Sequence, residues 1–139
     1  MKILITIFLT LLTPILFAQE DVPEEYWIKD SEFENKISEH HAFGDDDKLP
    51  IVVEFWASFN AANCFADWDK IKDAVYYRVD IASAPITKKK YKVRMAPTIL
   101  IFKEGLVEES FKAGLDLLLP TDLKEIQESI NEINNASKF

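Results

Sequence analysis

The chain has 139 residues, 48% of them apolar and 29% charged, and a formal net charge of -8. This composition excludes a disordered or low-complexity chain, and the length suits a single domain. The acidic balance argues against nucleic acid and anionic membrane surfaces as main partners. The single cysteine excludes an intramolecular disulfide, a Cys-x-x-Cys redox pair and a multi-cysteine zinc site.

The N-terminus has the pattern of a secretory signal. Lys2 precedes an apolar stretch over residues 3–17, and the small residue Ala18 follows it. The stretch is short for a membrane span of ~20 residues, which favours cleavage after Ala18 over a retained membrane anchor through residues 3–17. We therefore predict a signal peptide at residues 1–18 and a periplasmic or extracellular location. Contact with a membrane is expected only if this segment is retained.

Strands and helices alternate along the rest of the chain. Residues 19–25 are acidic and contain Pro23, which predicts a flexible lead-in. Apolar runs rich in β-branched and aromatic residues predict strands at residues 26–28, 51–56, 75–81, 98–102 and 106–113. Helices are predicted at residues 31–40, with Asp30 and Ser31 as capping residues, at 63–73, at 85–91 and after Thr121. This order predicts an α/β fold in which helices flank both faces of a mixed sheet.

Three motifs, in this order, resemble the thioredoxin family. They are Val53-Glu54-Phe55-Trp56-Ala57, similar to the strand that enters the family's active-site loop; Tyr91-Lys92-Val93-Arg94-Met95-Ala96-Pro97-Thr98, where the family has a cis-proline; and Phe102-Lys103-Glu104-Gly105, similar to its closing hairpin. The resemblance implies a thioredoxin-like domain with a thioredoxin fold over residues 26–135, followed by a tail at residues 136–139. It also implies a cis bond before Pro97.

The redox motif of the family is missing. Thioredoxins have Cys-Gly-Pro-Cys where this chain has Asn60-Ala61-Ala62-Asn63, so asparagine stands at both cysteine positions. Dithiol exchange needs one thiolate that attacks and a second thiol that resolves the mixed disulfide, and an amide does neither. We therefore expect no dithiol–disulfide oxidoreductase activity and no cofactor.

Glu54 and Cys64 are the remaining candidates for redox chemistry. The resemblance places Glu54 where thioredoxins bury an acid beneath the cysteines. Burial without a cation would raise its pKa, and we expect water or a hydrogen bond to satisfy it. In the first turn of the predicted helix, Cys64 would have a lowered thiol pKa, which makes it the candidate site of an alternative function, a single-thiol redox enzyme or sensor. The simpler interpretation of Cys64 is a partly buried packing residue.

The favoured function is protein binding. The resemblance places six residues around the groove where the family holds its partners: Phe59, Asn60, Asn63, Met95, Ala96 and Pro97. We predict that this groove binds an extended or apolar segment of another protein, or subunits of an envelope complex, with the amides of Asn60 and Asn63 in place of sulfur. Two alternatives remain. Either the chain's own loops cover the groove, or the domain is a rigid spacer that uses another face, such as Lys88 to Lys90.

No metal site is predicted. His40, His41 and Asp45 to Asp47 include metal-ligating groups, but adjacent histidines on a helix point in different directions. The acidic run is typical of a solvated loop, and nothing in the pattern fixes a ligand geometry.

Overall fold

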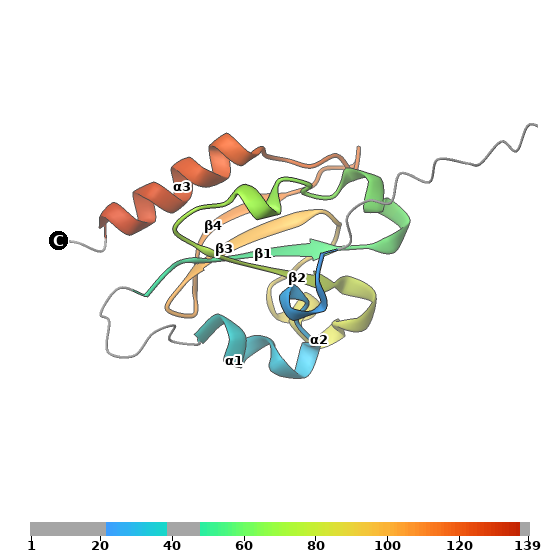
Figure 1. Cartoon of the computed structure of the whole chain (residues 1–139). Helices are drawn as coiled ribbons and strands as arrows, with labels where there is room; N and C mark the ends of the chain where they lie inside the picture. The colour runs from blue at the N-terminus through green and yellow to red at the C-terminus, as the bar shows by residue number, and fades with distance from the viewer. Residues whose placement is uncertain (1–21, 39–47, 137–139) are drawn as a thin grey trace, which may run out of the picture.

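The described part of the computed structural model, residues 22–38 and 48–136, contains a four-stranded sheet with helices on both faces (Figure 1). Its strands are β1 (Ile51–Trp56), β2 (Val75–Asp80), β3 (Thr98–Lys103) and β4 (Leu106–Lys112), in the spatial order β2-β1-β3-β4. β1 runs parallel to β2 and antiparallel to β3, and β4 is antiparallel to β3. The predicted α/β fold with a mixed sheet is therefore confirmed.

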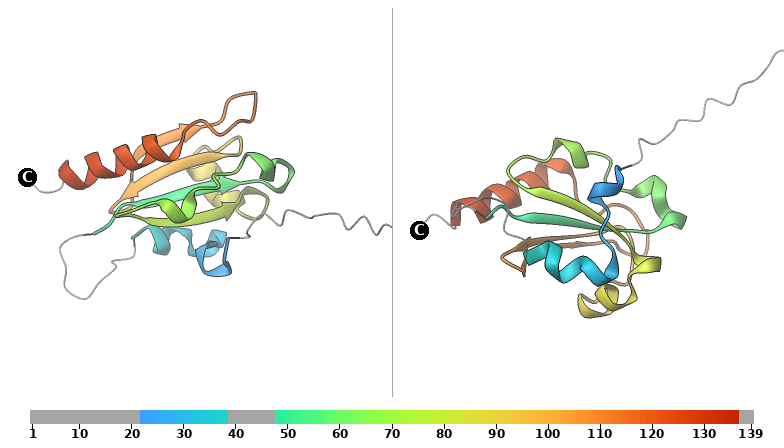
Figure 2. Two further views of the ribbon diagram at one scale, coloured as in Figure 1. Left: turned by 45° about the horizontal axis from the view of Figure 1, so that its top comes forward. Right: turned by 60° about the horizontal axis from the view of Figure 1, so that its bottom comes forward.

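The helices divide between the two faces of the sheet. α1 (Phe33–Ser38) and α2 (Pro85–Lys90) lie on one face and α3 (Leu123–Ala136) covers the other, as two further views show (Figure 2). Successive residues of β1 point to opposite faces. Val53 therefore joins the core that contains Phe33 of α1, and Val52 joins the core that contains Ile130 of α3. Because each such side chain contributes roughly 1.5–3 kcal/mol when buried, the two cores hold the helices on the sheet.

The polar groups at the helix starts differ from the predicted caps. Asp30 does not cap its own helix. Its carboxylate accepts hydrogen bonds at the start of α2, from the backbone N–H groups of Ile86 and Thr87 at 3.0 and 2.8 Å and from Thr87 Oγ1 at 2.6 Å. These bonds, that from the Thr87 side chain above all, lower the pKa of Asp30. At the start of α3, Asp122 accepts the capping bond from the backbone N–H of Glu125, at 2.8 Å.

Two predicted elements are wrong. Residues 26–28 form no strand beyond a single bridge between Trp27 and Arg78, and residues 63–73 form no α-helix. In place of that helix are two 3-10 turns, Ser58–Asn63 and Trp68–Lys70, with extended backbone at Cys64 between them.

The sequence itself contains a physical reason for the missing helix. Phe65, Trp68 and Ile71 are spaced by three each time, whereas the ~3.6 residues per turn of an α-helix need steps of four as well as three to keep apolar residues on one face. The segment also contains residues whose side chains compete for backbone hydrogen bonds and so have poor helix propensity: Asn63, Asp67, Asp69 and Asp73. The backbone of Phe65 instead forms hydrogen bonds with the buried side chains of Glu54 and Arg78, which stabilise the irregular path of the segment.

Candidate functional site

Asn60 lies at the centre of the candidate site, on the 3-10 turn Ser58–Asn63. Its Nδ2 donates one hydrogen bond to the carbonyl oxygen of Ala96 and one to that of Leu117, both at 2.8 Å. Asn63 Nδ2 donates to Asn60 Oδ1, also at 2.8 Å. We call Asn60, Asn63, Ala96 and Leu117 the asparagine clamp, because Asn60 joins three segments that are far apart in the sequence.

The polar groups of the predicted groove form hydrogen bonds with other parts of the same chain. The Ala96–Pro97 peptide bond is cis, and the carbonyl oxygen of Pro97 accepts a hydrogen bond from the N–H of Ala113 at 3.2 Å. The connection that follows β4 thus lies beside the proline loop, close to the turn that carries Asn60 (Figure 1). Both N–H donors of the Asn60 amide are used here. The prediction gave these amide donors to a partner, whereas the structure uses both within the chain.

The predicted groove residues differ in their exposure. Ala96 and Pro97 are buried, whereas Asn60, Asn63 and Met95 are half-buried. Phe59 is 73% exposed, and it is the predicted groove residue that is most open to another molecule.

Two further apolar side chains belong to the candidate site, and the sequence analysis missed both. Leu115 and Leu118, in the connection after β4, are 91% and 54% exposed. The bond from Asn60 to Leu117 joins this connection to the turn that carries Phe59. We call Phe59, Leu115 and Leu118 the clamp surface. Leucines within a polar connection were the available signal, but no pattern in the sequence joins this connection to the turn that carries Phe59.

A buried charged cluster contacts the connection that carries Asn60. Glu54 and Arg78 are register partners on the parallel strands β1 and β2, and they are 0% and 6% exposed. Arg78 Nη2 donates to Glu54 Oε1 at 3.1 Å, and Tyr76 Oη donates to the same oxygen at 2.7 Å. Glu54 Oε2 accepts the backbone N–H of Phe65 at 2.9 Å. Glu54 therefore holds the chain just after Cys64, where the predicted helix is absent.

The electrostatics of this cluster follow from its burial. Burial raises the pKa of Glu54, and the Arg78 guanidinium and the Phe65 N–H offset this only in part. Burial and the nearby Glu54 carboxylate also raise the pKa of Tyr76, so Tyr76 stays a neutral hydrogen-bond donor. The expected hydrogen bond to Glu54 is thus present, but the cation beside it is a residue that the sequence analysis missed. The signal was Arg78 itself, the one cation of β2, with the apolar residues Tyr77 and Val79 on either side of it.

Cys64 does not have the surroundings of an activated thiol. It follows a 3-10 turn in extended conformation, with φ -67° and ψ 164°, so the predicted place in the first turn of an α-helix is wrong. Burial raises the pKa of its thiol, and the lowering by Arg78 is smaller. A thiol with a raised pKa is a weaker source of the thiolate that reacts at neutral pH.

Several predictions fall on residues 1–21, 39–47 and 137–139, which lie outside the described residues. They concern the signal segment, His40, His41 and Asp45 to Asp47. Within residues 22–38 and 48–136, no helix has both the length and the apolar character that a membrane crossing requires. In the same ranges, no three His, Cys, Asp or Glu side chains gather as the ligands of a metal ion would.

The fold and the site together define a class. A mixed sheet in the order β2-β1-β3-β4, a cis-proline loop at Pro97 and a facing loop with asparagine at both redox positions describe a thioredoxin-like domain without Cys-x-x-Cys.

Comparison with known proteins gives the family. The thioredoxin family model matches residues 25–125. Thioredoxin M4 from the chloroplast of Arabidopsis thaliana is 30% identical over an alignment of 105 residues, which covers 67% of this chain and 47% of that protein. The chain thus spans about half the length of this curated relative. The chain belongs to the thioredoxin family, as its motifs predicted.

Solved thioredoxins share the fold at low sequence identity. A mutant thioredoxin of Halobacterium salinarum superposes with a TM-score of 0.59 at 15% identity, over 76% of this chain and 87% of that one. The thioredoxin of Schistosoma mansoni gives a TM-score of 0.57 at 19% identity, over 76% and 92% of the two chains. That of Plasmodium falciparum gives 0.56 at 17% identity, over 76% and 96%.

Proposed function

We propose that this thioredoxin-like domain is exported, does not exchange disulfides through paired cysteines, and binds another protein through the clamp surface. The observation that carries the proposal is the bonding of Asn60. Asn60 stands at the position of the family's first cysteine, and its side-chain amide donates both N–H groups to backbone carbonyl oxygens of the same chain, those of Ala96 and Leu117. The residue that would react in a thioredoxin is here a structural tie.

The hydrogen bond from Asn60 to Leu117 holds together the two segments that carry the clamp surface. Phe59 and Leu118 each neighbour a residue of the Asn60–Leu117 bond, and Leu115 lies two residues before Leu117. Exposed apolar side chains that cluster on one surface are typical of protein interfaces, and an aromatic residue is the commonest anchor. A surface that is already fixed loses less conformational entropy when a partner binds. An apolar segment of a partner, for example within an envelope complex, fits this surface.

Export is the part of the proposal that the N-terminal pattern supports. A positive charge, an apolar stretch and the small residue Ala18 have the order of a cleaved secretory signal. The mass of the protein purified from its native host tests this directly. We expect a mature chain that begins at Gln19, and a chain that still starts at Met1 would contradict export with cleavage.

The alternative function, a single-thiol redox site at Cys64, has less support. Burial raises the thiol pKa, and the sequence holds no second cysteine that could resolve a mixed disulfide.

Photo-crosslinking tests the binding function at the proposed surface. A benzoylphenylalanine placed at position 59 or at position 115 is expected to crosslink one and the same protein in the native host. The same group at position 112, an exposed position on β4, is the control and should not capture it. If positions 59 and 115 capture nothing, or only what position 112 captures, the clamp surface does not bind a partner.

A pair of matched substitutions measures the same surface. Phe59→Asp places a charge on an apolar side chain that is 73% exposed, and Leu106→Asp does so at one that is 68% exposed and lies on the β3–β4 hairpin. We expect Phe59→Asp to abolish recovery of the crosslinked partner and Leu106→Asp to leave it unchanged. Equal losses would place the binding surface elsewhere.

A further inference from the structure

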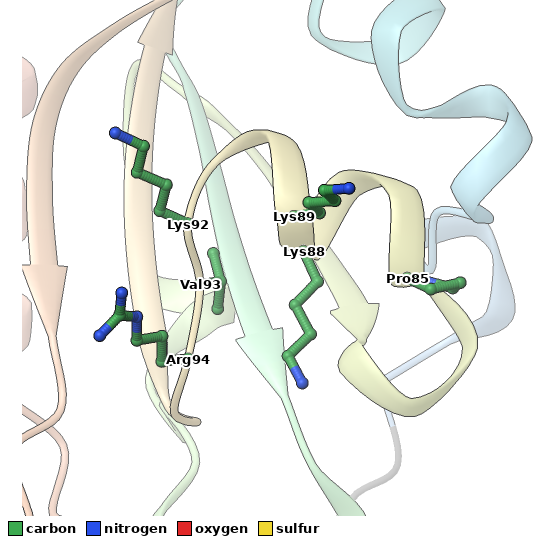
Figure 3. A pocket seen from close by; sticks show the side chains of 6 residues that line it. All are labelled: Pro85, Lys88, Lys89, Lys92, Val93 and Arg94. Atoms are coloured by element: carbon green, nitrogen blue, oxygen red, sulfur yellow. The ribbon is translucent and has the colours of Figure 1, made fainter.

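A second surface, separate from the clamp surface, carries a concentration of positive charge. A hollow of about 430 Å³ is lined by four cations and two apolar side chains: Lys88, Lys89, Lys92, Arg94, Pro85 and Val93. We call it the basic pocket (Figure 3). Lys88 and Arg94 lie on either side of Val93, and the side chain of Lys92 points away from that of Arg94. Its size is within the range of small ligand sites, ~300–1,000 Å³.

The backbone around the basic pocket is fixed by the end of α2. The N–H of Val93 donates to the carbonyl oxygen of Lys88 at 2.9 Å, and the N–H of Lys92 donates to that of Lys89 at 3.3 Å. This pair of bonds is the Schellman ending of a helix, which brings the residue after the turn back against the last helical turn. Arg94 is thereby placed beside the lysines of α2 rather than continuing away from them.

Helix stability alone does not explain these four cations. Lysines in the last turn of a helix interact favourably with its C-terminal carbonyl groups, which accounts for Lys88 and Lys89. Lys92 and Arg94 lie beyond the helix. Lys92 moreover has φ 55°, the left-handed conformation in which the Schellman ending usually has glycine. A residue kept in a less favourable backbone conformation is a reason to look for a function of its side chain.

The four cations are unpaired within the described part of the chain. Among the residues that the structure describes, none of the four side chains makes an ion pair or a hydrogen bond, whereas the neighbouring Lys90 binds Glu34 Oε1 at 2.8 Å. Four like charges around one hollow repel one another, so an anion that enters the hollow is attracted by all of them.

We propose that the basic pocket binds an acidic peptide segment of another protein. Carboxylates of the segment pair with Lys88 and Arg94, and its aliphatic carbons contact Val93 and Pro85. Four of the 16 basic residues line the pocket, so the rest of the sequence carries 12 basic against 24 acidic residues. An extended polyanion, such as a nucleic acid or an anionic membrane, would meet that negative charge, whereas a short segment meets only the pocket.

The inference rests on the proposed function in one respect, that the chain binds another protein. It adds the charge of the partner. Arg94 lies two residues before Ala96, whose carbonyl oxygen accepts a hydrogen bond from Asn60, the residue next to Phe59 of the clamp surface. The two surfaces share no residue, and their tests are therefore independent.

Fluorescence anisotropy of a labelled (Glu-Asp)3 peptide, with purified full-length protein at low salt, tests the pocket. We expect the Lys88→Gln/Arg94→Gln variant to raise the Kd by about tenfold, since each lost charge pair is worth up to ~1 kcal/mol. Lys112→Gln/Lys124→Gln removes the same charge from other elements and is expected to change the Kd by less than about twofold. The uncharged peptide (Gln-Asn)3 should not bind.

A third variant separates binding from folding. Lys92→Gly removes a cation of the pocket but favours the left-handed backbone there. It should weaken binding of (Glu-Asp)3 without lowering the melting temperature. A loss of binding that appears only in variants with a lowered melting temperature would overturn the proposal.

The remaining outcomes are decisive as well. No anisotropy change up to millimolar protein, or equal effects of the two double variants, would overturn the proposal. So would binding to phosphatidylglycerol vesicles or to a labelled oligothymidine through these cations when (Glu-Asp)3 does not bind. Phe59→Asp should leave peptide binding unchanged. Peptide binding without a crosslinked partner at position 59 would therefore contradict the proposed function and not the pocket.

Discussion

Two connections leave the same edge of the sheet, because the parallel strands β1 and β2 end there, and they have opposite kinds of structure. For the connection of residues 57–74 the sequence predicts a helix, and the chain is irregular. For the connection of residues 81–97 it predicts a short helix, and α2 forms. The connection of residues 57–74 carries Phe59 of the clamp surface, and the connection of residues 81–97 carries the basic pocket.

The difference teaches which forces organise each connection. Residues 81–97 follow mainly local signals, Pro85 in the first turn of α2 and the Schellman ending at Lys92 and Val93, and the distant Asp30 adds hydrogen bonds only at the start of α2. Residues 57–74 are set by polar side chains that reach across the molecule, above all Asn60 and Glu54. A single substitution of one of these polar side chains should therefore disturb residues 57–74 strongly, whereas a single substitution should disturb residues 81–97 only weakly.

The largest effect is expected from Arg78→Leu. It leaves the Glu54 carboxylate buried without its cation and removes the donor to Tyr76 Oη. Breaking one side of a buried ion pair costs roughly 3–5 kcal/mol of unfolding free energy, measurable by urea denaturation. The double variant Glu54→Gln/Arg78→Leu should recover part of this loss, since no unpaired charge remains. If the single variant lost less than about 1 kcal/mol, the cluster would not organise residues 57–74.

A smaller effect is expected from Asn60→Ala. The carbonyl groups of Ala96 and Leu117 lose their shared donor, which costs about 1–3 kcal/mol. Amide hydrogen exchange in residues 113–120 should speed up while that of β1 and β3 stays slow. Asn63→Ala, which removes only the bond to Asn60, serves for comparison and should cost less. Unchanged exchange in residues 113–120 would mean that the clamp does not hold this connection.

Asp30 tests the second connection through pH. Hydrogen bonds from Thr87 and Ile86 lower the folded-state pKa of Asp30, so its stabilisation of α2 is complete above the unfolded value of ~3.9 and is lost as the pH falls through the folded value. Asp30→Asn should therefore melt at a lower temperature than the wild type at pH 7. Below about pH 4 the two melting temperatures should converge. A gap that stays constant down to acid pH would exclude the carboxylate as the cause.

The smallest effect has the opposite sign. Lys92→Gly relieves the left-handed backbone at the end of α2 and should raise the unfolding free energy by about 0.5 kcal/mol. Lys89→Gly, inside α2, should lower it by about 1 kcal/mol, because glycine is a poor residue inside a helix. If both variants were destabilised alike, the left-handed position would not be strained.

The same contrast explains how much the sequence could predict. Strands β1 and β3 follow from continuous apolar runs, and α3 follows from its apolar stripe, which is why the family resemblance located the fold. Glu54 was identified as a buried acid within a strand. Its partner Arg78 required the register of β1 and β2, and the partner of Asn60 required a connection 57 residues away. Such long-range polar pairs leave no periodic pattern.

The central claim is that the loop of Asn60 to Cys64 is structural and that partner binding needs no thiol. The most direct test is recovery of the native partner with wild-type protein and with Cys64→Ser side by side, with and without reductant, followed by mass spectrometry. We predict the same stoichiometric partner in all four samples. A partner that appears only with the thiol, and only without reductant, would show that Cys64 forms a mixed disulfide and would contradict the account.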